Sequence, residues 1–150
     1  MITAQTEPWS KAVGEMRVLF PLHWQKLSLN KDIPLDPNYA AYAAHEQAGR
    51  LLCVALRDQG RLIGYWVSVI APGLHYQSTL TAIMDMWYVL PEYESGTASL
   101  SLMRAVEKEY TRRNVARAFA GEKNHLPCGR LYEAFGYRPI ETIYSKVYRP

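Results

Sequence analysis

The order of apolar and polar residues predicts two helices at the start of the chain. A first helix is expected to open at Pro8, and Pro21 is expected to end or kink it, because proline lacks the backbone donor that a helix interior needs. Its apolar face follows spacings of three and four: Trp9, Val13, Met16 and Phe20. A loop rich in Asp and Pro at 30–37 leads to a second helix, with Asp36 as N-cap and Pro37 as first residue, to about residue 48.

Beyond residue 50 the pattern changes to short apolar runs separated by turn residues, which indicates strands. The expected strands are 51–56, 61–70, 80–89, 115–120 and 140–148. Residues 58–60 are expected to form a hairpin turn, and Gly64 is expected to mark a close backbone approach or a bulge. Further helices are expected after Gly96 and over 127–135. Helices first, an antiparallel meander next and then strand–helix–strand–helix–strand indicate one α+β domain over 1–150, with a mixed central sheet covered on both faces.

The composition is that of a folded protein and excludes several functional classes. Of the 150 residues, 49% are hydrophobic and 21% are charged, which suits one core and argues against disorder. The net charge of +3 is mild and the basic residues are scattered, so a nucleic-acid partner is not expected. Cys53 and Cys128 indicate no disulfide framework, and the histidines show no metal-ligand spacing. With no signal-peptide pattern and no membrane-spanning run, the sequence predicts a soluble cytoplasmic protein without membrane contact.

The most informative stretch is 85–99, where an apolar strand runs into a short turn and a helix follows. The turn and the first helical residues include Gly96, Thr97 and Ser99. Such a turn leaves backbone N–H groups free and points a helix N-terminus at its surroundings, which attracts phosphate. A second signal follows at 129–137, which reads Gly-Arg-Leu-Tyr-Glu-Ala-Phe-Gly-Tyr.

Together and in this order, the two stretches resemble the cofactor half of acetyl-CoA-dependent N-acetyltransferases of the GNAT superfamily, over roughly 51–148. The resemblance implies an α/β/α sandwich with N-terminal helices, an antiparallel meander and a C-terminal β-α-β-α-β order. Residues 89–91 match the family's Val-x-Pro, whose splayed strand binds the pantetheine arm of coenzyme A, here through Trp87, Tyr88 and Val89. Residues 131–137 match Leu-Tyr-x-x-x-Gly-Phe, with Tyr137 in place of the final Phe.

The phosphate turn departs from the family pattern Arg/Gln-x-x-Gly-x-Gly/Ala. Counted from the proline, the pattern begins at Glu94, whereas a slip of one residue restores Gly-x-Ala but places Tyr93 first. A carboxylate at Glu94 repels a diphosphate by an amount on the order of 1 kcal/mol, so weakened coenzyme A binding is expected. The resemblance implies that the diphosphate is bound by Ser95, Gly96, Thr97, Ala98 and Ser99. His125 replaces the family's asparagine beside Asn124, and both are implied to line the mouth for the pantetheine arm.

Acetyl transfer from a thioester to an amine needs a base, a polarised carbonyl and a proton donor for the thiolate. Tyr132 holds the family's tyrosine position and is implied to be the acid; the alternative is a packing residue. Asp85 is the candidate base because a carboxylate in an apolar strand needs a partner or a function; the alternative is a salt-bridged or sheet-edge aspartate. A backbone N–H from 88–90 is expected to polarise the carbonyl. His75 and Tyr76 are expected in a loop, either at the substrate end or on the surface.

The leading hypothesis is an acetyl-CoA-dependent N-acetyltransferase that modifies an amine of a small molecule or a protein, without a metal. The alternative is a non-catalytic GNAT-fold protein that binds a macromolecular partner and keeps weak coenzyme A affinity. Small GNAT-like proteins encoded by bacteriophages are similar in length. No motif indicates the acceptor, and a homodimer that pairs through the last strand is a further expectation.

Overall fold

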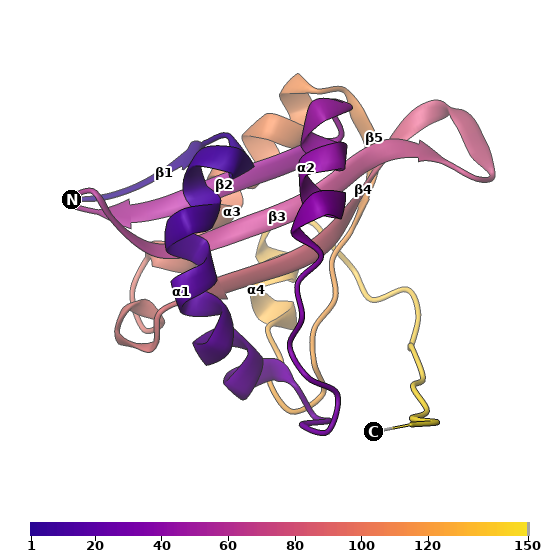
Figure 1. The fold of residues 1–150 in the computed structure, drawn as a ribbon. Helices are drawn as coiled ribbons and strands as arrows, with labels where there is room; N and C mark the ends of the chain where they lie inside the picture. The colour runs from indigo at the N-terminus through magenta and orange to yellow at the C-terminus, as the bar shows by residue number, and fades with distance from the viewer. Residues whose placement is uncertain (150) are drawn as a thin grey trace.

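A five-stranded mixed sheet forms the middle layer of the structure, a computed structural model that describes residues 1–149 (Figure 1). Its strands lie in chain order: β1 (Ile2–Thr6), β2 (Leu51–Asp58), β3 (Arg61–Gly73), β4 (Tyr76–Val89) and β5 (Val115–Phe119). Neighbours from β1 to β4 are antiparallel, and β4 pairs with β5 in parallel. The mixed sheet is confirmed, but β1 was not predicted, because five residues at a chain end carry little periodicity.

Helices cover both faces of this sheet, which confirms the α+β sandwich. Figure 1 shows α1 (Trp9–Leu27) and α2 (Tyr39–Gln47) over one face, with α3 (Ala98–Arg112) and α4 (Gly129–Ala134) over the other. A short 3-10 helix, η1 (Pro91–Tyr93), links β4 to α3. Four apolar residues at helical spacing form the buried face of α3: Leu102, Met103, Val106 and Tyr110. Among residues 1–149, no helix combines the length and the apolar content that crossing a bilayer requires.

Two predicted helix boundaries are corrected by the structure. Pro21 does not end α1 but lies inside it, where its exposed position lets water reach the carbonyl that the missing N–H leaves free. The second helix begins later than expected: its N-cap is Asn38 and not Asp36, since the Asn38 side chain accepts a hydrogen bond from the backbone N–H of Ala41 at 3.0 Å.

The strand expected over 140–148 is absent from the described chain, and residues 138–149 are exposed and form neither helix nor strand. A strand needs a neighbouring edge to pair its backbone, and no segment among residues 1–149 is paired with this one. The hairpin of β3 and β4 is longer than expected, because β3 continues beyond its predicted end at residue 70 to Gly73 and β4 begins at Tyr76. Tyr76 accordingly begins β4 and does not lie in a loop.

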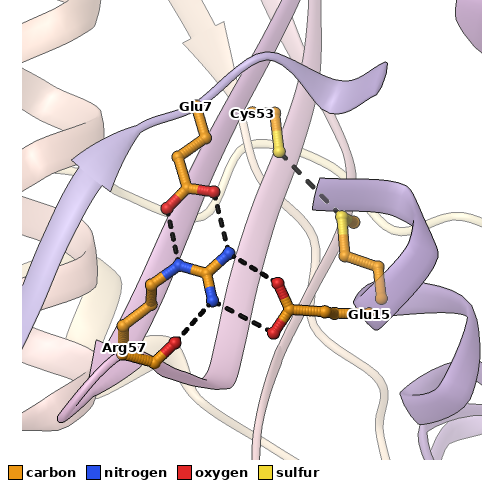
Figure 2. A network of polar contacts seen from close by, with 6 residues as sticks. Glu7, Glu15, Cys53 and Arg57 are labelled. Atoms are coloured by element: carbon orange, nitrogen blue, oxygen red, sulfur yellow. Dashed lines mark hydrogen bonds and ion pairs between the residues drawn. The ribbon is translucent and has the colours of Figure 1, made fainter. Parts of the chain in front are cut away.

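The guanidinium of Arg57 on β2 holds the N-terminal part of the chain against the sheet. Figure 2 shows it between Glu7, just after β1, and Glu15 on α1. Arg57 Nε lies 2.7 Å from Glu7 Oε1, and one terminal nitrogen lies 2.9 Å from Glu15 Oε1. Hydrogen bonds from Arg57 hold the pKa of both carboxyls below its ordinary value. This network ties the start of α1 and the residue after β1 to β2.

Candidate functional site

The two parallel strands β4 and β5 separate partway along their length. Their register runs from Leu80 opposite Val115 to Ile83 opposite Phe119. Beyond this point β4 continues to Val89, whereas the chain leaves β5. We call the opening between residues 84–89 of β4 and residues 119–121 the splay. Backbone groups of β4 that face the splay have no strand partner within residues 1–149, so they are available to an extended ligand.

The orientation of these backbone groups follows from one hydrogen bond. The N–H of Leu90 donates to the carbonyl of Ile63 on β3 at 2.8 Å, so Leu90 and Tyr88 face β3. Successive residues of a strand alternate, and the N–H and C=O of Trp87 and Val89 therefore face the splay. One backbone N–H over 88–90 is expected to polarise the carbonyl. Those of Tyr88 and Leu90 face β3, so that of Val89 is the one that faces the splay.

A bulge in β4 displaces Asp85. Met84 lies opposite Ser68 and Met86 lies opposite Val67, so Asp85 is the extra residue on β4. A bulge redirects a side chain out of the regular alternation. The exposed carboxylate of Asp85 accepts a hydrogen bond from the Tyr42 hydroxyl of α2 at 2.5 Å. Burial raises the pKa of the Tyr42 phenol, and the bond to Asp85 raises it further, so Tyr42 stays a donor.

Tyr132 of α4 lies across the splay. Its hydroxyl accepts a hydrogen bond from Trp87 Nε1 of β4 at 2.9 Å and donates to the carbonyl of Gly121, just after β5, at 2.7 Å. Met84 Sδ is 3.6 Å from the same oxygen. Burial raises the pKa of this phenol well above its ordinary value, with Cys128 adding to the effect. The hydroxyl therefore stays protonated, and it connects the two strands where they diverge.

Side chains of neighbouring β4 residues point to opposite faces of the sheet. The Trp87 indole meets Tyr132 beneath α4, and the buried Tyr88 ring stacks on His23 of α1 at a centroid distance of 4.9 Å. Val89 is also buried. Across β3, a Cβ added at Gly64 would come within 2.6 Å of the Tyr88 carbonyl oxygen, so the expected close backbone approach is confirmed. These contacts fix the strand end whose backbone faces the splay.

The predicted phosphate turn is formed where η1 passes into α3. Thr97 is the N-cap residue and makes no side-chain capping bond, so the first N–H groups of α3 are not capped by their own turn. Ser95, Gly96 and Thr97 are exposed, Ser99 is half-buried and Ala98 is buried. The structure therefore brings 95–99 together at one helix N-terminus, as the spacing predicts.

Lys26 is a member of this site that the sequence analysis missed. It lies in the last turn of α1, and its ammonium forms an ion pair with the carboxylate of Glu94. The same Nζ lies 5.8 Å from the centroid of the Tyr88 ring. The acidic residue that departs from the family pattern thus has a cationic partner beside it. No local signal identifies this pair, because the two residues are far apart in the chain.

The other candidate residues are all exposed. Asn124 and His125 are exposed in the turn before α4, where Lys123 and Leu126 form an isolated bridge. Tyr76 is the first residue of β4, nine residues before Asp85, which corresponds to about 30 Å along a strand. His75, in the adjoining turn, is at that distant end too, so His75 and Tyr76 do not join the site. Within residues 1–149, no cluster of three His, Cys, Asp or Glu side chains is placed to hold a metal ion.

Known sequences and structures resemble this chain over most of its length. A family model described as the acetyltransferase (GNAT) family matches residues 16–137. The structure is similar to a ribosomal-protein-alanine N-acetyltransferase from Brucella melitensis biovar Abortus 2308, with a TM-score of 0.76, 15% identity and coverage of 100% of this chain and 99% of that chain. It is also similar to AAC(6')-Iy in complex with a bisubstrate analogue, with a TM-score of 0.72, 16% identity and coverage of 100% and 99%. A protein from Clostridium acetobutylicum described as a predicted acetyltransferase, crystallised with acetyl-CoA, has a TM-score of 0.70, 8% identity and coverage of 98% and 96%. No curated protein sequence is significantly similar to this chain.

Proposed function

Because the chain belongs to the GNAT acetyltransferase family, we propose that it is an acetyl-CoA-dependent N-acetyltransferase acting on an amine of a small molecule or a protein. The observation that carries the proposal is the position of the Tyr132 hydroxyl, which joins Trp87 of β4 to Gly121 after β5 at the splay. A buried, protonated hydroxyl at this point is suited to stabilise a leaving group bound between the two strands.

Two segments are proposed to hold acetyl-CoA. The uncapped N–H groups of 97–99 and the neighbouring hydroxyls suit its diphosphate, because a helix N-terminus favours anions. The outward N–H and C=O groups of Trp87 and Val89 suit the amides of its pantetheine arm. Asn124 and His125 remain proposed contacts at the mouth. When bound, acetyl-CoA supplies an activated acetyl group.

In the proposed reaction, Asp85 receives a proton from the acceptor ammonium, directly or through water, and the neutral amine then attacks the thioester carbonyl. A carbon–nitrogen bond forms, the carbon–sulfur bond breaks, the sulfur leaves as a thiolate, and the extra proton on the attacking nitrogen passes to solvent water. Burial raises the pKa of Tyr132, so hydrogen-bond donation to the thiolate contributes more than complete loss of the phenolic proton. The hydroxyl turns from the Gly121 carbonyl to the sulfur by rotation about its C–O bond.

The acceptor class is suggested by the similar structures. One of them is named a ribosomal-protein-alanine N-acetyltransferase, and another is bound to an analogue of coenzyme A and acetylneamine. The test is to incubate the purified chain with acetyl-CoA, peptides with N-terminal alanine and aminoglycosides, and to measure free thiol. Release that depends on the acceptor supports the proposal, and Leu29→Ser, in an exposed loop, is the control variant. Absence of release across the panel with coenzyme A bound would refute it.

A second proposal is a non-catalytic GNAT-fold protein that binds a macromolecular partner with weak coenzyme A affinity. The acidic Glu94 at the phosphate turn favours it. A thermal-shift measurement with acetyl-CoA separates the two proposals, because a bound ligand raises the melting temperature by mass action. A shift at low ligand concentration favours the enzyme. Both proposals place the protein in the cytoplasm, where Cys53 and Cys128 remain free thiols.

A further inference from the structure

The carboxylate of Asp85 is held by a neutral hydrogen-bond donor and not by a cation. The Tyr42 hydroxyl of α2 donates to Asp85 Oδ2 at 2.5 Å, and within residues 1–149 no lysine, arginine or histidine forms an ion pair with Asp85. Burial and this bond both raise the pKa of the Tyr42 phenol, so the donor stays uncharged. The carboxylate therefore keeps its negative charge, and Oδ1 accepts no side-chain hydrogen bond from the described part of the chain.

The bulge in β4 turns Asp85 away from its neighbours in the strand. Met84 Sδ and Trp87 Nε1 lie 3.6 Å and 2.9 Å from the Tyr132 hydroxyl, so both side chains face α4. In a regular strand two residues three apart point to opposite faces, and the extra residue of the bulge brings these two to the same face. Asp85 lies between them and reaches α2, which covers the other face (Figure 1). The proposed base and the proposed acid thus lie on opposite sides of β4, which gives the acceptor and the departing sulfur separate approaches.

Tyr42 is itself fixed by the packing of the two N-terminal helices. Its ring stacks on the buried indole of Trp9, the first residue of α1, at a centroid distance of 5.3 Å and an interplanar angle of 17°. The backbone N–H of Ser10 donates to the carboxylate of Glu46 at 3.2 Å, which joins the same two helices one turn further along α2. An exposed carboxylate can adopt several rotamers, and a hydrogen bond from a fixed ring selects one of them. Because Asp85 is exposed, this bond determines where its free oxygen points.

We propose that Tyr42 is a positioning residue, whose hydroxyl holds Asp85 Oδ2 so that Oδ1 meets the ammonium group of the acceptor. This inference rests on the proposed acetyl transfer with Asp85 as base, and it adds a residue of α2 to that site. In the step concerned, one N–H bond of the ammonium breaks and an O–H bond forms at Oδ1, while the electron pair stays on the nitrogen. A neutral donor suits this step, because a lysine or arginine at the same place would cancel the charge that attracts the ammonium.

The test is a double-mutant cycle on kcat, measured as acceptor-dependent thiol release at saturating acetyl-CoA. Tyr42→Phe removes only the hydroxyl, and Asp85→Asn removes the base. Tyr39→Phe is the matched control, because Tyr39 lies on the same helix and its ring centroid is 6.3 Å from that of Trp9. Within residues 1–149 the Tyr39 hydroxyl makes no hydrogen bond to another side chain, so its removal leaves Asp85 unaffected.

We expect Tyr42→Phe to lower kcat roughly tenfold and Asp85→Asn to lower it about a hundredfold, since a correctly placed base contributes at least that much. The double variant is expected to match Asp85→Asn, because a residue that acts through another has no effect once the other is gone. The kcat of Tyr39→Phe is expected to equal that of the unchanged chain. The KM for acetyl-CoA is expected to be the same in Tyr42→Phe as in the unchanged chain, because the proposed cofactor contacts lie on β4 and α3.

Asp85→Glu is a second variant, which leaves α2 and the core untouched because Asp85 is exposed. It keeps the carboxylate but moves it by one methylene group, so kcat is expected to fall about tenfold. Losses that multiply in the double variant Tyr42→Phe/Asp85→Asn, or a loss in Tyr39→Phe equal to that in Tyr42→Phe, would show that Tyr42 acts by packing and would overturn the proposal. An unchanged kcat in Asp85→Glu would overturn it too. A chain that acetylates no amine would overturn the proposed function together with this inference, whereas turnover with multiplying losses would overturn the role of Tyr42 alone.

Discussion

Replacing Tyr132 by Phe removes one oxygen atom from the centre of the proposed active site. The structure shows two hydrogen bonds at that oxygen, from Trp87 Nε1 and to the Gly121 carbonyl. Each such bond contributes roughly 0.5–1.5 kcal/mol net, so Tyr132→Phe is expected to lower the free energy of unfolding by about 1–3 kcal/mol. Urea denaturation measures this loss.

Tyr132→Phe is expected to lower kcat by more than its loss of stability can account for. A positioned proton donor contributes about 10²–10⁴-fold to a rate. Since Tyr132 acts chiefly as a hydrogen-bond donor in the proposed reaction, we expect kcat to fall by about a hundredfold, or roughly 3 kcal/mol of barrier. The KM for acetyl-CoA is expected to change little, because the proposed cofactor contacts are backbone groups of β4 and the α3 N-terminus.

The matched comparison is Trp87→Phe, which removes the donor to the same oxygen but keeps the Tyr132 hydroxyl. Its free energy of unfolding is expected to fall by roughly 0.5–1.5 kcal/mol for the one hydrogen bond lost, with a further packing loss from the smaller ring, whereas its kcat is expected to fall by less than about tenfold. Thiol release with an accepted amine provides kcat for both variants. If kcat falls equally in both, Tyr132 acts by packing and the reasoning is refuted; unchanged kcat in Tyr132→Phe refutes it as well.

Three further changes test other parts of the site. Lys26→Met leaves the Glu94 carboxylate without its cationic partner. Calorimetry is expected to show coenzyme A affinity weakened by about fivefold, or ~1 kcal/mol, because the carboxylate then repels the diphosphate. The affinity for pantetheine, which has no diphosphate, is expected to be unchanged, and equal losses for both ligands would contradict this reasoning. Burial lowers the pKa of His23 from 6.5 to about 4, so a proton binds His23 more tightly in the unfolded chain than in the folded one. The free energy of unfolding is therefore expected to fall by up to about 3 kcal/mol as the pH falls from about 6.5 towards 4. His23→Gln is expected to flatten that part of the stability curve in urea titrations, and an unchanged slope would contradict the burial argument. Gly64→Ala places a methyl group against the β4 backbone and is expected to lower the free energy of unfolding by about 1–3 kcal/mol in urea denaturation. Gly14→Ala, on the open surface of α1, is expected to raise it by about 0.5–1 kcal/mol. Equal effects of the two variants would show that the β4 backbone moves to make room for the methyl group.

The sequence by itself determined the local backbone of most elements. The turn over 58–60 is formed with positive φ at Gln59 and Gly60, and Asn114 and Gly136 also adopt positive φ where a helix ends. The apolar spacing along α3 identified its buried face. These features depend on interactions within a few residues, so a pattern read along the chain is enough to predict them. The positions of Tyr132 and of the phosphate turn followed from family motifs of the same local kind.

Only the tertiary structure decided which of these residues meet. The bulge in β4 brings Asp85 to Tyr42, α1 brings Lys26 to Glu94, and α4 brings Tyr132 to Trp87. Each pair joins distant parts of the chain, and its formation depends on strand register and helix crossing, which no local pattern encodes. The segment over 140–148 also shows that local pattern alone does not decide structure. Its residues favour a strand, but a strand forms only where another edge pairs with its backbone, and residues 1–149 show no such pairing.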